Sequence, residues 1–129
     1  MNLKFMLLSA MLLTNLFYNK IQSYPTQINN DGDFGAAINS GQVVIAVGGQ
    51  AQRIQLNAVN AQLDQVKGTG SFPSVQFYFA FIEDIPMATV QYQLPGLKVL
   101  VFKDRSLKGK IYVPTSATDM FNRIQSYLG

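Results

Sequence analysis

Buried-strand patterns and amphipathic helical patterns alternate along the chain after residue 25. Residues 42–47 (QVVIAV) and 75–82 (VQFYFAFI) are uncharged runs of β-branched and aromatic side chains, which is typical of strands covered on both faces. Between them, residues 50–67 carry apolar side chains at intervals of three and four, which predicts a helix with one apolar face. The side chains of that face are Leu56, Val59, Leu63 and Val66.

Shorter patterns complete the element order. We expect strands over residues 26–28, 99–102 and 110–113, and helices over residues 33–39, 86–91 and 117–128. A polar hairpin turn over residues 103–106 joins the last two strands. Strand–helix–strand units pair parallel strands through right-handed crossovers, and a hairpin adds antiparallel strands. The order therefore predicts an α/β fold in which a mixed central sheet carries helices on both faces.

The first residues have a pattern of their own. Lys4 precedes an apolar run over residues 5–13 (FMLLSAMLL), which is shorter than the roughly 20 residues that a bilayer span needs. The run has the length of the apolar region in a secretory signal. We predict that residues 1–23 are a signal peptide cleaved after Ser23 and that residues 24–129 form one domain. The protein would then be exported to a periplasm, the ER lumen or the extracellular space. An uncleaved anchor is the alternative, with membrane contact through this segment alone.

The composition removes several kinds of chemistry. The chain of 129 residues contains no cysteine, histidine or tryptophan. Disulfides, thiol nucleophiles, Cys/His zinc sites and Ser–His or Cys–His dyads are therefore excluded. Glu83 and Asp84 are the adjacent acids, and neighbours in a strand point to opposite faces, so they are not expected to act together. We expect no enzyme activity, no cofactor and no metal.

The charge argues against nucleic-acid binding. The formal net charge is +3, and removal of Lys4 and Lys20 with the signal would leave about +1. A nucleic-acid-binding domain carries a domain-wide basic surplus along one face. We therefore expect a protein or peptide partner rather than DNA or RNA.

Local sequences over residues 26–129 resemble the thioredoxin-like superfamily in order and spacing. Residues 29–34 resemble the polar turn and phenylalanine that open its first helix, and residues 40–45 resemble its entry into the central strand. Residues 82–86 (IEDIP) resemble the V-D-x-x-P stretch after its third strand. Residues 92–104 resemble its Y-x-I/V, G-I and L-x-x-F-K-D/N-G run. The resemblance implies a three-layer fold with a mixed sheet of about five strands.

The positions of the family's redox site depart from its pattern. An ungapped match places the C-x-x-C motif, within a residue or two, at Gln52, Arg53, Ile54 and Gln55. The family's cis-proline falls at Lys98 and its buried acid near Ala46. A cis bond before a residue other than proline costs about 2.5–4 kcal/mol, so we expect a trans peptide before Lys98. Thiol–disulfide exchange needs a thiolate, so the resemblance implies a redox-inactive member.

Binding is the function left by these exclusions. The resemblance implies an apolar groove for extended segments beside the cis-proline position, and such recognition needs no redox chemistry. The corresponding residues are Gly49, Gln50, Ala51, Gln52, Leu94, Pro95, Gly96 and Leu97. Our hypothesis is a chaperone-like or adaptor domain for protein or peptide partners; an adaptor would use this groove, the last helix or the aromatic strand edge.

A second hypothesis concerns the basic hairpin between Lys98 and Lys110. Besides Lys98, its basic residues are Lys103, Arg105, Lys108 and Lys110. They are the candidate patch for weak binding to anionic surfaces or ligands. They are also the kind of residues that protect an edge strand from pairing with other chains.

Overall fold

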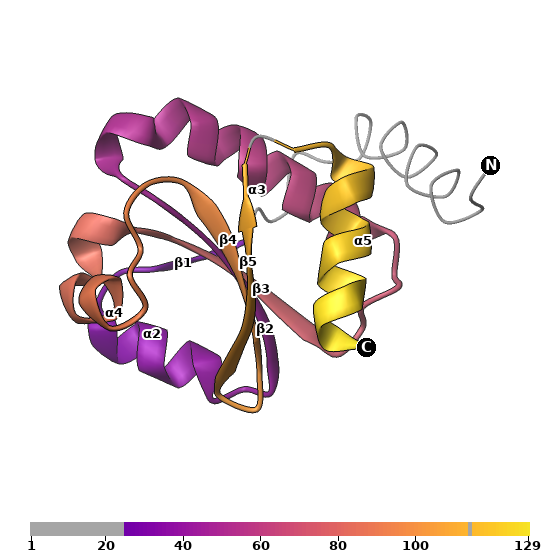
Figure 1. Ribbon diagram of the computed structural model, residues 1–129, viewed down its shortest axis with the longest axis horizontal. Coiled ribbons are helices and arrows are strands. Elements are labelled where there is room, and N and C mark those ends of the chain that lie inside the picture. The colour runs from indigo at the N-terminus through magenta and orange to yellow at the C-terminus, as the bar shows by residue number, and fades with distance from the viewer. Residues whose placement is uncertain (1–24, 114) are drawn as a thin grey trace.

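A single mixed sheet forms the centre of the computed structural model, which describes residues 25–113 and 115–129 (Figure 1). The predicted signal peptide, residues 1–23, lies outside the described residues. The five strands are ordered β1-β3-β2-β4-β5. β3 pairs in parallel with β1 and β2, and β4 pairs antiparallel with β2 and β5. Their bounds are β1 Thr26–Ile28, β2 Gln42–Gly48, β3 Val75–Phe81, β4 Lys98–Lys103 and β5 Ser106–Tyr112.

Helices cover both faces of this sheet, which confirms the predicted three-layer α/β architecture. Figure 1 shows α2 (Asp31–Ile38) and α4 (Pro86–Gln91) on one side. It shows α3 (Arg53–Gly68) and α5 (Ala117–Leu128) on the other. A single 3-10 turn, Gln50–Gln52, precedes α3, and a second, Ile82–Asp84, follows β3.

β2 is the central strand, as its continuous apolar run predicts. Val44 and Ala46 pack against α3 and α5, whereas Val43, Ile45 and Val47 pack against the α2 and α4 layer. All five side chains are fully buried. Burial on both faces explains why this strand shows no alternation of polar and apolar residues.

The prediction for the last strand was wrong at its start. β5 begins at Ser106, before the predicted residue 110, because pairing with β4 starts directly at the end of the predicted turn, with Ser106 opposite Lys103. Asp104 and Arg105 both have positive φ, 53° and 70°, which a two-residue primed turn requires. An arginine in this conformation is uncommon, so the sequence carried no signal for it. Because β5 is an edge strand with many polar side chains, its alternation of buried and exposed positions could not be recognised in the sequence.

Candidate functional site

The segment predicted to be equivalent to the C-x-x-C motif, residues 52–55, lies at the start of α3. β2 ends at Gly48, and the chain enters α3 through the 3-10 turn Gln50–Gln52. The Gly49 N–H donates to Gln52 Oε1 at 3.0 Å. The Gln50 N–H donates to the Glu83 carboxylate, at 3.1 and 3.2 Å from its two oxygens. Glu83 therefore ties this turn to the end of β3.

The side chains of this turn offer packing and hydrogen bonds rather than a nucleophile. The Arg53 guanidinium donates to Gln50 Oε1 at 2.8 Å and lies 5.7 Å from the centroid of the Phe81 ring. Ile54 is 83 % exposed. The chain supplies no thiol at any of these positions, so it cannot itself carry out thiol–disulfide exchange.

Lys98, predicted to occupy the cis-proline position of the thioredoxin-like superfamily, is buried. It opens β4 between Val47 of β2 and Tyr112 of β5, and the residue is 6 % exposed. Its ammonium lies 5.2 Å from the centroid of the Tyr112 ring. Burial, and then the nearby charge of Lys110, lower the pKa of Lys98 below its ordinary 10.5. Counting Lys98 with the exposed basic hairpin was wrong, because an inner strand between two partners covers its stem.

The other basic residues of the hairpin do not share one face. Lys103 Nζ donates to the Leu128 carbonyl of α5 at 3.4 Å. Lys110 Nζ donates to the carbonyls of Tyr92 and Gln93, at 2.7 and 3.2 Å, beyond the end of α4. Both satisfy carbonyls at helix C-termini, where a cation is favourable, but on opposite sides of the sheet. Arg105 and Lys108 remain exposed near the hairpin turn.

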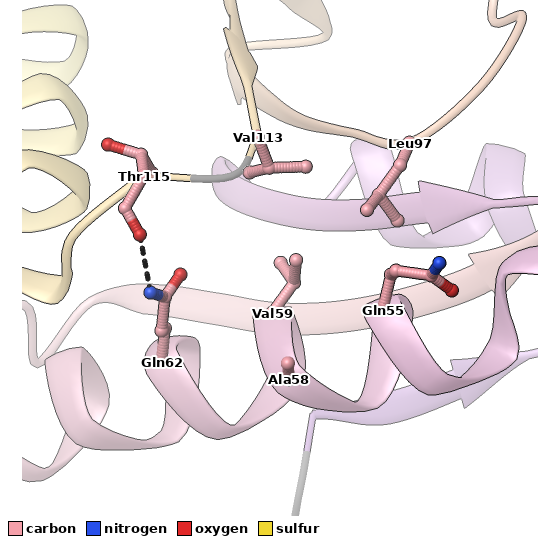
Figure 2. A pocket seen from close by; sticks show the side chains of 7 residues that line it. All are labelled: Gln55, Ala58, Val59, Gln62, Leu97, Val113 and Thr115. Atoms are coloured by element: carbon pink, nitrogen blue, oxygen red, sulfur yellow. Dashed lines mark hydrogen bonds between the residues drawn. The ribbon is translucent and has the colours of Figure 1, made fainter.

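An apolar pocket of about 190 Å³ opens between α3, the entry to β4 and the exit of β5 (Figure 2). Val59 points from α3 toward Leu97 and Val113 across the pocket. Gln62 Nε2 donates to the Thr115 carbonyl at 2.5 Å and closes one end. None of the lining side chains is charged. They belong to Gln55, Ala58, Val59, Gln62, Leu97, Val113 and Thr115.

The predicted groove overlaps this pocket only in part. Leu97 lines it and lies against Gly48, where an added Cβ would come within 2.8 Å of Leu97 Cδ1. Leu94, by contrast, is fully buried in the core beside α4 and is unavailable to a partner, which corrects its place in the groove. Gly49 is buried as well. Gln50 and Ala51 lie in the 3-10 turn before α3, and Pro95 and Gly96 lie in the loop before β4.

Sequence reasoning missed most of the pocket because three distant segments build it. Ala58 and Gln62 are one helical turn apart on α3, beside the buried Val59. That spacing was the available signal for a second, shallower stripe on the helix. Val113 and Thr115 reach the pocket only through the pairing of β5, whose course the sequence did not reveal.

Two kinds of feature are absent from the described residues: a cluster able to hold a metal ion and a helix able to cross a membrane. Residues 25–113 and 115–129 contain no group of three or more acidic side chains placed to hold a metal ion. Within the same ranges, no helix has both the length and the apolar character to cross a membrane.

Comparison with known proteins supports the fold. No family model and no curated protein matches the sequence. A thioredoxin variant from Halobacterium salinarum NRC-1 superposes with a TM-score of 0.67 at 8 % identity, over 80 % of this chain and 89 % of its own. Mitochondrial thioredoxin 3 from Saccharomyces cerevisiae gives a TM-score of 0.64 at 19 % identity, over 79 % and 94 %.

A third similar structure concerns the thiol resolving mechanism of yeast mitochondrial 1-Cys peroxiredoxin via glutathione/thioredoxin systems. Its chain gives a TM-score of 0.64 at 20 % identity, over 81 % of this chain and 99 % of its own. These likenesses, at 8–20 % identity, are in the fold rather than in the sequence. The chain therefore has the thioredoxin-like fold, built without a cysteine.

Proposed function

We propose that the domain binds extended protein or peptide segments and holds one apolar side chain of the partner in the pocket beside Leu97. The observation that carries this proposal is the pocket itself, apolar and uncharged at the end of the sheet. Its volume of about 190 Å³ exceeds the roughly 150 Å³ of an engineered cavity that accepts benzene. One aliphatic or phenyl side chain would therefore fit.

An exposed apolar side chain beside the pocket supports this proposal. Ile54 precedes the lining residue Gln55 on α3, lies one helical turn before the lining residue Ala58, and is 83 % exposed. Large apolar side chains at a surface are characteristic of interaction sites. A partner that covered Ile54 would extend the contact beyond the pocket along α3.

The proposal also includes export. Its support is the apolar run over residues 5–13, which has the length of a secretory signal. A cysteine-free domain of this kind is stabilised by its core alone, in an oxidising or a reducing compartment. The binding role is that of a chaperone-like or adaptor domain without thiol–disulfide chemistry.

Filling the pocket tests the binding function. Ala58 is exposed and lines the pocket, so Ala58→Trp should fill the pocket without disturbing the core. Asn57, also exposed and one residue earlier on α3, does not line it, so Asn57→Trp is the matched control. Each chain, tagged after Gly129, would be crosslinked in the cells that produce it, and captured proteins quantified by mass spectrometry. We expect Ala58→Trp to lose the partners that wild type and Asn57→Trp retain; equal capture by all three would refute the proposal.

A further inference from the structure

We propose that the segment bound at the pocket is acidic, with a carboxylate next to its apolar residue that pairs with Lys98. This inference rests on the proposed function and adds the chemical class of the partner. Leu97 and Lys98 are adjacent at the start of β4. Leu97 lines the pocket on the α3 side, whereas Lys98 belongs to the strand face that packs against the α2 and α4 layer.

Lys98 is a cation without an anion. Among the described residues it makes no hydrogen bond and no ion pair, and its ammonium lies over the Tyr112 ring. The charged group that affects its pKa is Lys110, another cation. The strands on either side cover its stem, while its ammonium reaches solvent. The fold thus places a cation without an ionic partner at the strand end next to Leu97, on the face of β4 opposite the pocket.

The surroundings of Lys98 leave it available to a partner. Lys110 is held by the carbonyls of Tyr92 and Gln93, so it contributes charge but has donors already engaged. Glu83, which follows β3, accepts from the Gln50 N–H and forms no ion pair with Lys98 among the described residues. The stem of Lys98 is covered, but its ammonium keeps contact with solvent and is open to a partner from that side.

Charge complementarity therefore selects the occupant. Successive residues of an extended segment point to opposite sides, as Leu97 and Lys98 do. A partner that crosses this strand end with an apolar side chain in the pocket would bring its next side chain toward Lys98. A carboxylate there would form a charge-assisted hydrogen bond with the ammonium. An uncharged residue would leave Lys98 buried against the partner and unpaired.

Short peptides test the inference. The probes are acetylated and amidated hexapeptides with the centres Ser-Leu-Glu-Ser and Ser-Glu-Leu-Ser, their glutamine counterparts, and versions with serine in place of leucine. Affinities would be measured from amide chemical-shift changes of the protein, isolated as its cells process it. We expect the better glutamate peptide to bind about fivefold more tightly than its glutamine counterpart at low salt. The preference should shrink at high salt, because the pair is partly screened.

Variants assign the preference to a residue. Lys98→Met should remove the preference for glutamate while leucine-dependent binding remains, and Lys98→Arg should retain it. Lys108→Met, an exposed lysine of the hairpin, should leave it unchanged. If Lys98→Met does not fold, the comparison of glutamate with glutamine peptides on the wild-type protein still tests whether an acidic segment is preferred.

The outcomes separate the two proposals. Equal binding of glutamate and glutamine peptides, with leucine still required, would overturn the acidic partner and leave the pocket function intact. A preference lost in Lys108→Met but kept in Lys98→Met would also overturn it and point to the hairpin as an anionic-surface binder. Binding that ignores leucine, or no binding at millimolar peptide, would overturn both proposals.

Discussion

At the scale of single residues, Asn60 is the polar side chain that the core leaves unsatisfied. It lies on α3, is 3 % exposed, and its Oδ1 has no hydrogen-bond partner among the described residues. A buried acceptor without a donor costs about 1–3 kcal/mol. The apolar stripe of α3 gives no reason for an amide at this place, so sequence reasoning did not consider it.

Replacement of Asn60 should therefore stabilise the protein. We expect Asn60→Leu to raise the free energy of unfolding by about 1 kcal/mol, because the amide is replaced by an apolar group of similar volume. Urea denaturation measures the change. Asn57→Leu is the control, since Asn57 is exposed on the same helix and should change stability by less than about 0.5 kcal/mol. A loss of stability in Asn60→Leu would show that the amide has a partner or a role.

The register of the lost redox motif can be tested at the same scale. Gln52 precedes α3 with non-helical backbone angles, φ −107° and ψ 23°, and Gln55 lies in its first turn. The double variant Gln52→Cys, Gln55→Cys should form an intramolecular disulfide, as the C-x-x-C resemblance implies. The pair Ala58→Cys, Ala61→Cys has the same spacing inside the helix and should remain as thiols, since helical Cβ directions diverge. Mass spectrometry under mild oxidation distinguishes the states; free thiols at 52 and 55 would contradict the register.

At the scale of elements, continuous and periodic patterns were reliable guides. The helices predicted over residues 86–91 and 117–128 agree with α4 and α5, and the run over residues 42–47 is the central strand β2. Each has a local cause: a capping residue, a proline in the first turn or an uninterrupted apolar run. β5 was placed too late because its limits depend on a two-residue turn and on pairing with β4.

The residues of the candidate site also divide into those that a local pattern could predict and those that only packing across the sheet places. Leu97 and Gln55 could be assigned from the order of the motifs, because both lie next to recognisable strand or helix ends. Ala58, Val113 and Thr115 could not, because the contact of α3 with the β4 entry and the β5 exit is set by packing across the sheet. The burial of Lys98 and Leu94 was hidden for the same reason.

A tie between two helices gives a prediction at this scale. The Asp31 carboxylate, in the first turn of α2, accepts the N–H groups of Met87 and Ala88 at 3.1 and 3.0 Å and so caps α4. Asp31→Ala should lower the free energy of unfolding by about 1–2 kcal/mol, because α4 loses its N-terminal acceptor. Asp33→Ala, in the same turn, is the matched control and should cost less. Similar losses in thermal or urea unfolding would mean that the cap is not significant.

At the scale of the whole molecule, large hydrophobic side chains are exposed on separate surfaces, each of which could contact a partner. The large exposed hydrophobic side chains among the described residues are Ile54, Met87, Val90 and Tyr112. Ile54 lies beside the pocket on α3, whereas Tyr112 lies with Lys98 on the opposite face of the sheet. Met87 and Val90 lie together on α4. The location of bound partners therefore distinguishes the pocket from a rival surface on the opposite side of the sheet.

The buried charge of Lys98 should make stability depend on pH. Its pKa is lower in the folded chain than the ordinary 10.5, mainly through burial and secondly through Lys110, so the unfolded chain binds more protons in the window between the two values. The contribution of Lys98 to the free energy of unfolding then rises with pH in that window. We expect the stability difference between Lys98→Met and wild type to favour the variant most near neutral pH and to narrow toward pH 10.5. A stability difference between Lys98→Met and wild type that does not change with pH would contradict the assignment.

The most direct measurement is site-specific photocrosslinking in the cells that produce the protein. A benzophenone side chain would replace Ala58 in the pocket, Asn57 beside it, or Met87 on α4, which is 73 % exposed. Binding at the pocket predicts discrete crosslinked partners from position 58, fewer from position 57 and none from position 87. Partners crosslinked from position 87 and absent from position 58 would contradict the pocket as the binding site of this cysteine-free thioredoxin-like fold.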